Sequence, residues 1–194
     1  MLKSLVAKLE SLFRSPPAPL LHEDRPVRVA VAGHDLKFMP PYIEYFETNP
    51  RFELRIDEHD GHQVKSESVS RECVKWADMI FCEWALGNLV WYSRHKRPGQ
   101  LLISRLHLQE WQNRDRISFI YDTAWENVDD LLLTSHHVYD HMLEEFPVLR
   151  GPRARVLWCP IDASGAFNRE KSADALVRMG IVGIVPQRKR LDPA

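Results

Sequence analysis

Short apolar runs alternate with amphipathic stretches along most of this chain. Compact apolar runs are typical of strands, and apolar positions three or four residues apart are typical of helices. Strands that alternate with helices form βαβ units, so the pattern predicts an α/β fold, a Rossmann-like three-layer domain with a mostly parallel sheet. The predicted strands cover residues 27–32, 52–56, 79–83, 101–104, 117–121, 131–134 and 155–159.

Helices are expected in most of the intervals between these strands. Pro40 and Pro41 suit the first turn of a helix that ends near Thr48, because proline fixes φ and the first turn needs no amide donor. Ser135 is a suitable N-cap for a later helix that ends before a proline. The other predicted helices cover residues 66–76 and 86–95.

The first 26 residues carry a different pattern. Residues 1–14 place apolar side chains on one helical face, while Lys8 and Glu10 interrupt any continuous apolar run. This predicts an amphipathic helix, which is neither a transmembrane segment nor a secretory signal. Residues 15–26 are rich in proline and predict a stiff linker. Two interpretations stay open for the helix: it packs on its own domain or a second subunit, or it docks on a membrane surface or a partner protein.

The last part of the chain predicts the start of a second domain. Residues 180–186 are apolar and precede a basic run at 187–190, and no helical pattern follows. A strand without its helix is half of a βαβ unit. We therefore expect a Rossmann-like domain over residues 27–179 and a stub of a second α/β domain over residues 180–194, as in a truncated or split protein.

Composition excludes one class of partner. The 26 Lys and Arg residues balance 27 Asp and Glu residues, so the chain has no overall basic field that would attract nucleic acid. Any anion site must be local. The three cysteines are odd in number and widely spaced, which indicates reduced thiols and a cytoplasmic protein.

Polar residues gather where the predicted strands end. Arg105, His107 and Glu110 follow the strand at residues 101–104. Function in α/β proteins concentrates at the carboxyl ends of parallel strands, so these groups are expected beside a ligand-binding crevice. The ends of the first and third strands carry the remaining candidates, which are Gly33, His34, Asp35, Glu83 and Trp84.

Several of these residues also have a purely structural interpretation. His107 would satisfy a buried carbonyl at its strand end, and Arg105 with Glu110 would form an ion pair on a solvated loop, where such pairs contribute about 0–1 kcal/mol. His34 and Asp35 would close the turn after the first strand through a hydrogen bond from side chain to backbone.

The nine histidines prompt a search for a metal site. His137 and His141 lie four residues apart, but the His-Glu-x-x-His arrangement is absent. His59 and His62 lie in a segment with carboxylates nearby, but no cysteine is placed to join them. The sequence therefore predicts no bound metal.

The order of these features resembles the N-terminal, acceptor-side half of a GT-B glycosyltransferase of the family 4 type. Members of that family transfer sugars from nucleotide-sugar donors with retention. They carry a glycine-containing loop after the first strand, a histidine after the fourth, a Pro-x-Asp-like turn and a Gly-Arg-x-x-x-x-Lys segment that opens the donor domain. The corresponding residues here are Gly33 with His34 and Asp35, His107, Pro160 with Asp162, and Gly183 with Lys189.

The resemblance implies roles for the candidate residues. His107 would face the transferred sugar, and Gly33 would let the backbone approach phosphate or acceptor. The location of Arg105 and Glu110 at the same strand end, rather than the resemblance, indicates their roles: Arg105 would bind an acceptor or phosphate oxygen, and Glu110 would hold a sugar hydroxyl or position His107. Lys189 would grip the donor diphosphate.

The same resemblance names the ligands. The donor would be a nucleotide sugar that acts as substrate, with no further cofactor, and the acceptor a glycan or glycolipid. His34 and Asp35 would contact the acceptor, and Glu83 would line the cleft. A location at the inner face of the membrane would follow if residues 1–14 dock there.

The chain departs from the family pattern in its last segment. Ile184 stands where the family has an arginine, and the Glu-x7-Glu segment of the donor domain is missing. We therefore expect transfer only if a separate donor-domain chain completes the site. The alternative is a non-catalytic Rossmann-like module that binds a glycan, a membrane or a partner protein. An oxidoreductase is disfavoured, because the residues around Gly33 lack the Gly-x-Gly-x-x-Gly spacing.

Overall fold

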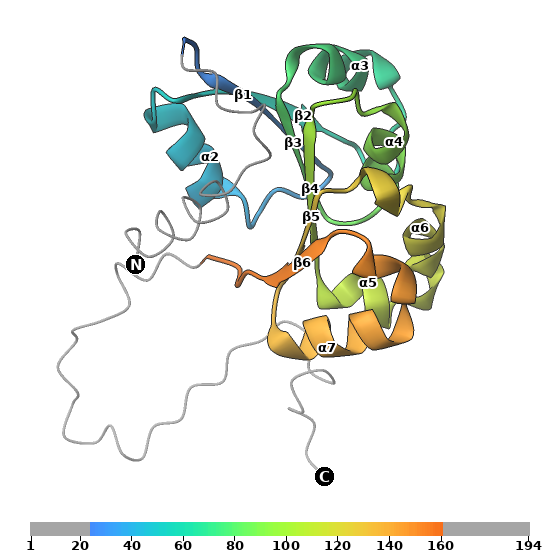
Figure 1. Cartoon of the computed structure of the whole chain (residues 1–194). Coiled ribbons are helices and arrows are strands. Elements are labelled where there is room, and N and C mark those ends of the chain that lie inside the picture. Colours follow the sequence, from blue (N-terminus) through green and yellow to red (C-terminus); the bar gives the residue numbers. More distant parts are fainter. Residues whose placement is uncertain (1–23, 161–194) are drawn as a thin grey trace, which may run out of the picture. The chain divides into compact units, whose positions relative to one another are not determined.

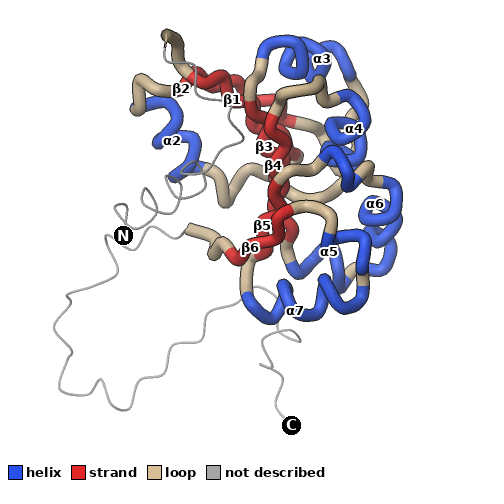
Figure 2. Tube along the Cα trace, viewed as in Figure 1, coloured by secondary structure: helices blue, strands red, loops and turns tan. Residues whose placement is uncertain are grey.

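The computed structural model describes residues 24–160. Within them six strands form one parallel sheet in the order β2-β1-β3-β4-β5-β6 (Figures 1 and 2). The strands are β1 (Val27–Gly33), β2 (Phe52–Glu58), β3 (Met79–Glu83), β4 (Leu101–Leu106), β5 (Asp130–Leu133) and β6 (Arg153–Val156). The helix predicted at residues 1–14, the linker up to residue 23, Asp162, and the segment 180–194 with Gly183, Ile184 and Lys189 lie outside the described residues.

The described helices cover the sheet on two sides. Helix α2 lies on one face, and the other helices lie on the opposite face (Figure 1). This arrangement confirms the three-layer prediction. The helices are α2 (Pro40–Thr48), α3 (Glu67–Trp76), α4 (Gly87–His95), α5 (Leu108–Gln112), α6 (Ile117–Asp122) and α7 (His136–Glu145).

Local chemistry explains where two of these helices begin. Proline occupies the first turn of α2, as predicted. The Ser135 hydroxyl accepts a hydrogen bond from the Val138 amide at 3.2 Å and caps α7. Caps of this kind stabilise a helix by about 1 kcal/mol.

The central strands bury every side chain. All residues of β3 and β4 are buried, which is usual for a parallel sheet with both faces covered. Most of these residues are apolar, but Glu83, Ser104 and Arg105 are not. A buried charge is unfavourable unless it is paired, so these residues need a specific explanation.

The strand order places a switch point between β1 and β3. From β1 the chain moves outward to β2, then crosses back to β3 and continues through β4, β5 and β6. In open α/β sheets the loops at such a point diverge and leave a crevice at the carboxyl ends of the strands. The ends of β1 and β3 carry Gly33 and Glu83, so the candidate residues lie at this point.

One predicted strand is wrong. Residues 117–121 belong to helix α6. A strand inside a parallel sheet is buried on both faces. This segment is not, because Ile120 is its buried residue and Tyr121 is 67% exposed. The neighbouring position in the sheet, beside β4, is taken by β5.

The last described strand is shifted from its predicted range. It covers Arg153–Val156, whereas 155–159 was expected. The Leu157 amide still donates to the Leu133 carbonyl at 2.9 Å, after which the chain leaves the sheet. This early exit brings Cys159 to the carboxyl ends of the strands.

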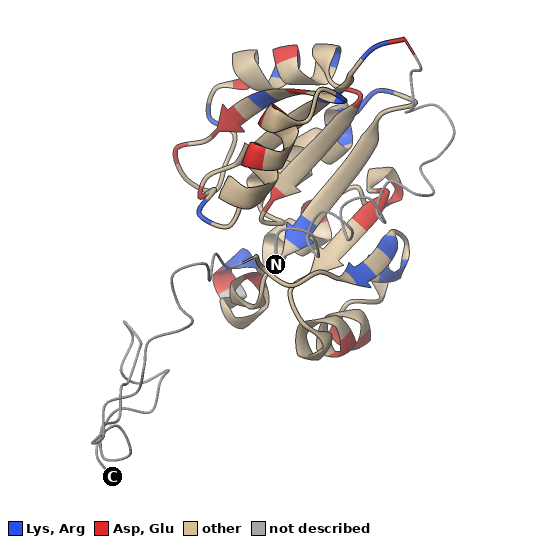
Figure 3. Cartoon of the chain, turned by 90° about the vertical axis from the view of Figure 1, so that its left-hand side faces the viewer, with Lys and Arg blue, Asp and Glu red and all other residues tan. Residues whose placement is uncertain are grey.

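Charges of both signs are interspersed on the face shown in Figure 3. Among residues 24–160, no helix is long and apolar enough to cross a membrane.

Candidate functional site

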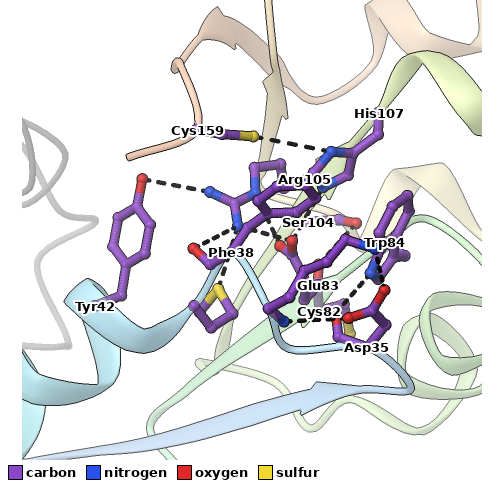
Figure 4. A network of polar contacts seen from close by, with 12 residues as sticks. Asp35, Phe38, Tyr42, Cys82, Glu83, Trp84, Ser104, Arg105, His107 and Cys159 are labelled. Carbon is purple, nitrogen blue, oxygen red and sulfur yellow. Dashed lines mark hydrogen bonds and ion pairs between the residues drawn. The ribbon is translucent and has the colours of Figure 1, made fainter. Parts of the chain in front are cut away.

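A buried ion pair joins the ends of β3 and β4. Glu83 and Arg105 are paired in the sheet register, and both are 0% exposed. Arg105 Nε lies 2.8 Å from Glu83 Oε2 and Nη2 lies 2.7 Å from Oε1, so the carboxylate is held by two parallel hydrogen bonds (Figure 4). Burial acts to lower the pKa of Arg105, but the charge and hydrogen bonds of Glu83 outweigh it and the pKa is raised.

The Arg105 guanidinium also contacts helix α2 and the loop before it. Arg105 donates to the Phe38 carbonyl at 3.3 Å and to the Tyr42 hydroxyl at 3.4 Å. Its charged carbon lies 5.2 Å from the Tyr42 ring centroid, within cation-π range. The interpretation of Arg105 and Glu110 as an exposed ion pair is therefore wrong, because Arg105 pairs with Glu83 in the interior.

His107 is attached to this pair. Its Nε2 lies 3.0 Å from Glu83 Oε1. An ionised carboxylate only accepts hydrogen bonds, so this contact assigns the ring proton to Nε2. Burial lowers the pKa of His107 in spite of the opposing effect of Glu83, and the imidazole is neutral at pH 7. Its Nδ1 faces the Cys159 thiol, with 3.9 Å between nitrogen and sulfur (Figure 4).

Aromatic rings pack against His107. The Trp84 ring stacks on the imidazole with centroids 4.1 Å apart and planes 27° apart. The Phe38 ring lies 5.2 Å away at 25°. The Trp84 indole also donates to the Asp35 carbonyl at 2.8 Å, which fixes it to the loop after β1. His107 is therefore held both by its ring nitrogen and by its ring face.

Glu110 binds backbone amides. Its buried carboxylate accepts the amide of Ala85 at 3.1 Å and that of His107 at 3.2 Å, so it joins the turn after β3 to the turn after β4. Burial raises the pKa of Glu110 to about 8. These contacts give Glu110 a positioning role for His107.

The loop after β1 carries two more predicted residues. The Asp35 carboxylate accepts the Lys37 amide at 3.2 Å and pairs with the Lys37 ammonium, so the predicted turn closure by Asp35 is confirmed. The His34 ring lies 5.6 Å from the Trp84 ring and 4.6 Å from that of His62. His34 thus lies beside Trp84 on the β1 side of the switch point.

Gly33 allows a close approach between two strands. A Cβ atom at this position would lie 2.9 Å from the Glu83 carbonyl oxygen and 3.0 Å from a Leu36 methyl carbon. Real Cβ atoms essentially never approach backbone oxygen that closely. The glycine therefore lets the end of β1 lie against the end of β3.

The structure brings most predicted site residues together. Glu83, Arg105, His107 and Glu110 form one connected network, and Trp84 links it to His34 and Asp35. Lys189 lies outside the described residues. Phe38, Tyr42 and Cys159 were not predicted as site residues. Phe38 and Tyr42 stand in no motif and at no predicted strand end, and Cys159 ends the predicted strand 155–159 but was interpreted as a reduced core cysteine.

A second buried cluster lies on the other face of the sheet. The Asp57 carboxylate accepts hydrogen bonds from the hydroxyls of Ser70 and Tyr92, each at 2.6 Å. His59 Nε2 lies 3.4 Å from the same carboxylate. Burial and the neighbouring Asp57 charge raise the pKa of Tyr92. The cluster joins β2 to α3 and α4. Its hydrogen bonds explain how the polar groups of Asp57, Ser70 and Tyr92 are buried.

Residues 24–160 contain no group of three or more His, Cys, Asp or Glu side chains arranged to hold a metal ion. No protein-family model matches this chain, and a comparison with curated proteins finds no match either.

Proposed function

We propose that this chain is the acceptor-side half of a glycosyltransferase that moves a sugar from a nucleotide-sugar donor to a glycan or glycolipid. The observation that supports this most is the neutral His107, held by Glu83 and stacked on Trp84 at the β1 and β3 switch point. Ligands of open α/β sheets bind at such points.

The charge state of His107 suits glycosyl transfer. When the bond to the leaving group breaks, the sugar develops positive charge in an oxocarbenium-like transition state. A charged imidazolium beside it would oppose that charge, whereas a neutral imidazole backed by a carboxylate stabilises it. Burial keeps His107 neutral, and Glu83 supplies the negative charge behind the ring.

The rigidity of the network serves the same reaction. Catalysis by preorganised groups requires that they hold their positions before the substrate arrives. Arg105 fixes the Glu83 carboxylate from one side, and Glu110 fixes the His107 backbone from the other. In this proposal Glu83, Arg105 and Glu110 are positioning residues, and His107 contacts the sugar.

A turnover assay tests the proposal. A panel of nucleotide sugars is incubated with this chain, and separately with the chain extended through the downstream coding sequence, and sugar transfer and nucleoside diphosphate release are measured. We expect activity in the extended protein and a loss of roughly 100-fold or more in His107→Ala. His141→Ala removes an exposed imidazole from α7 and is the matched control, with activity unchanged.

Two results would refute the proposal. One is that neither protein turns over any donor while this chain binds a glycan or a membrane specifically, which favours the non-catalytic module. The other is equal activity of His107→Ala and His141→Ala in the extended protein.

A further inference from the structure

Cys159 extends the chain of polar contacts beyond His107. Its sulfur lies 3.9 Å from His107 Nδ1, and Nε2 of the same ring lies 3.0 Å from Glu83 (Figure 4). Because the ring proton is on Nε2, Nδ1 carries a lone pair and the thiol is the donor in this contact. A nucleophile, a base and a carboxylate that orients the base therefore follow one another in the site, and contacts between nucleophile and base are often long in a resting site.

Cys159 differs from the other two cysteines in its surroundings. Cys73 and Cys82 are buried in the apolar core, whereas Cys159 is partly exposed. The chain leaves the sheet after Leu157, and the next side chain, Trp158, is 55% exposed. A dissolved reagent can therefore reach the Cys159 sulfur in the folded protein, but not the sulfurs of the other two cysteines.

The surroundings of Cys159 keep its thiol protonated. Burial raises the pKa of Cys159, and the Arg105 guanidinium opposes this effect. The charges of Glu83 and Glu110 raise the pKa further. A protonated thiol is a poor nucleophile unless a base accepts its proton. His107 is neutral and turns its unprotonated nitrogen toward the sulfur, so it is placed to act as that base.

We propose that Cys159 is a modification site where a small disulfide, such as glutathione disulfide, forms a mixed disulfide with His107 as the base. The Cys159 sulfur attacks one sulfur of the reagent, and its proton passes to His107 Nδ1. The S–S bond of the reagent breaks, and the leaving thiolate takes the proton from His107. One disulfide is consumed while one mixed disulfide and one free thiol form, so the exchange needs no other oxidant. Between the two proton transfers, the Glu83 carboxylate stabilises the imidazolium.

The effect on activity rests on the proposed function, in which the transferred sugar lies against His107. The mixed disulfide removes the thiol donor from His107 Nδ1 and adds a bulky group beside the imidazole. We expect it to block sugar transfer, and a reducing agent to restore it. The exchange itself does not depend on sugar transfer, so the two can be tested separately.

The pH dependence of the exchange tests the role of His107. The full chain is treated with glutathione disulfide from about pH 5 to about pH 9, a range that spans the ordinary pKa values of histidine and cysteine. Mass spectrometry of peptides identifies the modified residue. We expect modification of Cys159 alone, at a rate that levels off above the pKa of His107, because the neutral imidazole is the reactive form. A thiol that reacts without a base would instead accelerate about tenfold per pH unit up to its own raised pKa.

Two histidine variants give a second test. His107→Gln should slow the exchange near pH 7 by roughly 100-fold, the size of a general-base contribution. His141→Gln removes an exposed imidazole from α7 and is the matched control, with an unchanged rate. If His107→Gln does not fold, the pH profile of the unsubstituted chain decides alone.

Three results would overturn the inference. They are modification of Cys159 no faster than that of Cys73 and Cys82, a rate that keeps rising with pH beyond the pKa of His107, and equal rates in the two histidine variants.

Activity is measured in the protein extended through the downstream coding sequence. Its transfer rate should fall on modification and recover with dithiothreitol, and disulfide treatment should leave the rate of Cys159→Ser unchanged. Transfer that continues after complete modification would overturn the control of activity by this thiol. Base-assisted modification of Cys159 in a protein that transfers no sugar from any donor would support this inference and refute the proposed function.

Discussion

Glu83 accepts a hydrogen bond from His107 at 3.0 Å, and the exposed fractions of the two side chains are 0% and 7%. The same carboxylate is bound by Arg105, so three ionisable groups share one buried site. Removal of one partner leaves the others buried without compensation. This coupling makes the site sensitive to single substitutions that would be harmless at the surface.

Glu83→Gln should destabilise the fold. The substitution leaves the Arg105 guanidinium buried without a counter-charge, and the loss of one partner of a buried pair costs about 3–5 kcal/mol. Urea unfolding measures the change in the free energy of unfolding. Glu67→Gln, which breaks an exposed pair with Arg71, should cause little change. Similar values for the two variants would show that the buried pair is not structurally important.

The pKa of His107 should lie below its ordinary value and should fall further in Glu83→Gln. Burial lowers this pKa, while the Glu83 carboxylate raises it, so loss of the carboxylate charge removes the opposing effect. NMR titration of the imidazole measures both values. Since the neutral ring is the active form in our proposal, activity should rise as pH increases through the pKa of His107. A higher pKa in the variant would contradict the assigned contact.

The titration of Glu110 should make the protein less stable as pH rises from about 5 to 8. The pKa of Glu110 is about 8 in the folded state and near 4.3 in an unfolded chain, so between these values the folded state binds more protons. Stability from this group is complete below the unfolded pKa and is lost as pH approaches 8. Glu110→Gln cannot titrate, so its urea stability should lack this slope of up to about 1.4 kcal/mol per pH unit. Equal pH dependence in the two proteins would contradict the burial of an ionisable group here.

Gly87→Ala should reduce stability by about 1–3 kcal/mol, as is typical of overpacking. Its new methyl group would lie 2.4 Å from the His62 carbonyl oxygen. Gly151→Ala is the matched control, because the nearest atom to its Cβ is an ordinary 3.6 Å away. Thermal unfolding of the two variants gives the comparison. Equal melting temperatures would show that the loop containing His62 moves freely.

Tyr92→Phe should cost about 1.5–3 kcal/mol, the range for a hydrogen bond to a charged group. The Tyr92 hydroxyl lies 2.6 Å from the buried Asp57 carboxylate. Tyr121→Phe removes the same hydroxyl from a side chain that is 67% exposed and should be nearly neutral. Chemical unfolding of both variants tests whether the Asp57 cluster stabilises the fold.

The sheet could be predicted because its strands are continuous apolar runs between helical segments. The apolar run at residues 117–121 shows the limit of that argument, because a short run suits a strand or a helix equally well. Two features of the tertiary structure decide that this segment is a helix. Ile120 is the buried residue of the segment, and β5 occupies the position beside β4 in the sheet.

The sequence predicted the location of the candidate site more accurately than the contacts within it. Strand ends indicated Glu83, Arg105 and His107, but the pairing of Glu83 with Arg105 depends on the register between β3 and β4. Sequence spacing instead favoured Arg105 with Glu110. Cys159 came near His107 because the chain leaves the sheet after Leu157, which no local pattern indicates.

Trp84 has a φ of 70°, in the left-handed region that favours glycine. For another residue this conformation costs about 1–3 kcal/mol, so a large side chain at this turn works against folding. Selection from a library of variants at position 84 should therefore give different residues when stability is selected and when ligand binding is selected. Enrichment for thermal resistance alone should favour glycine, and enrichment for ligand capture should favour tryptophan. A trade-off of this kind would mark position 84 as one where natural selection has favoured activity over robustness.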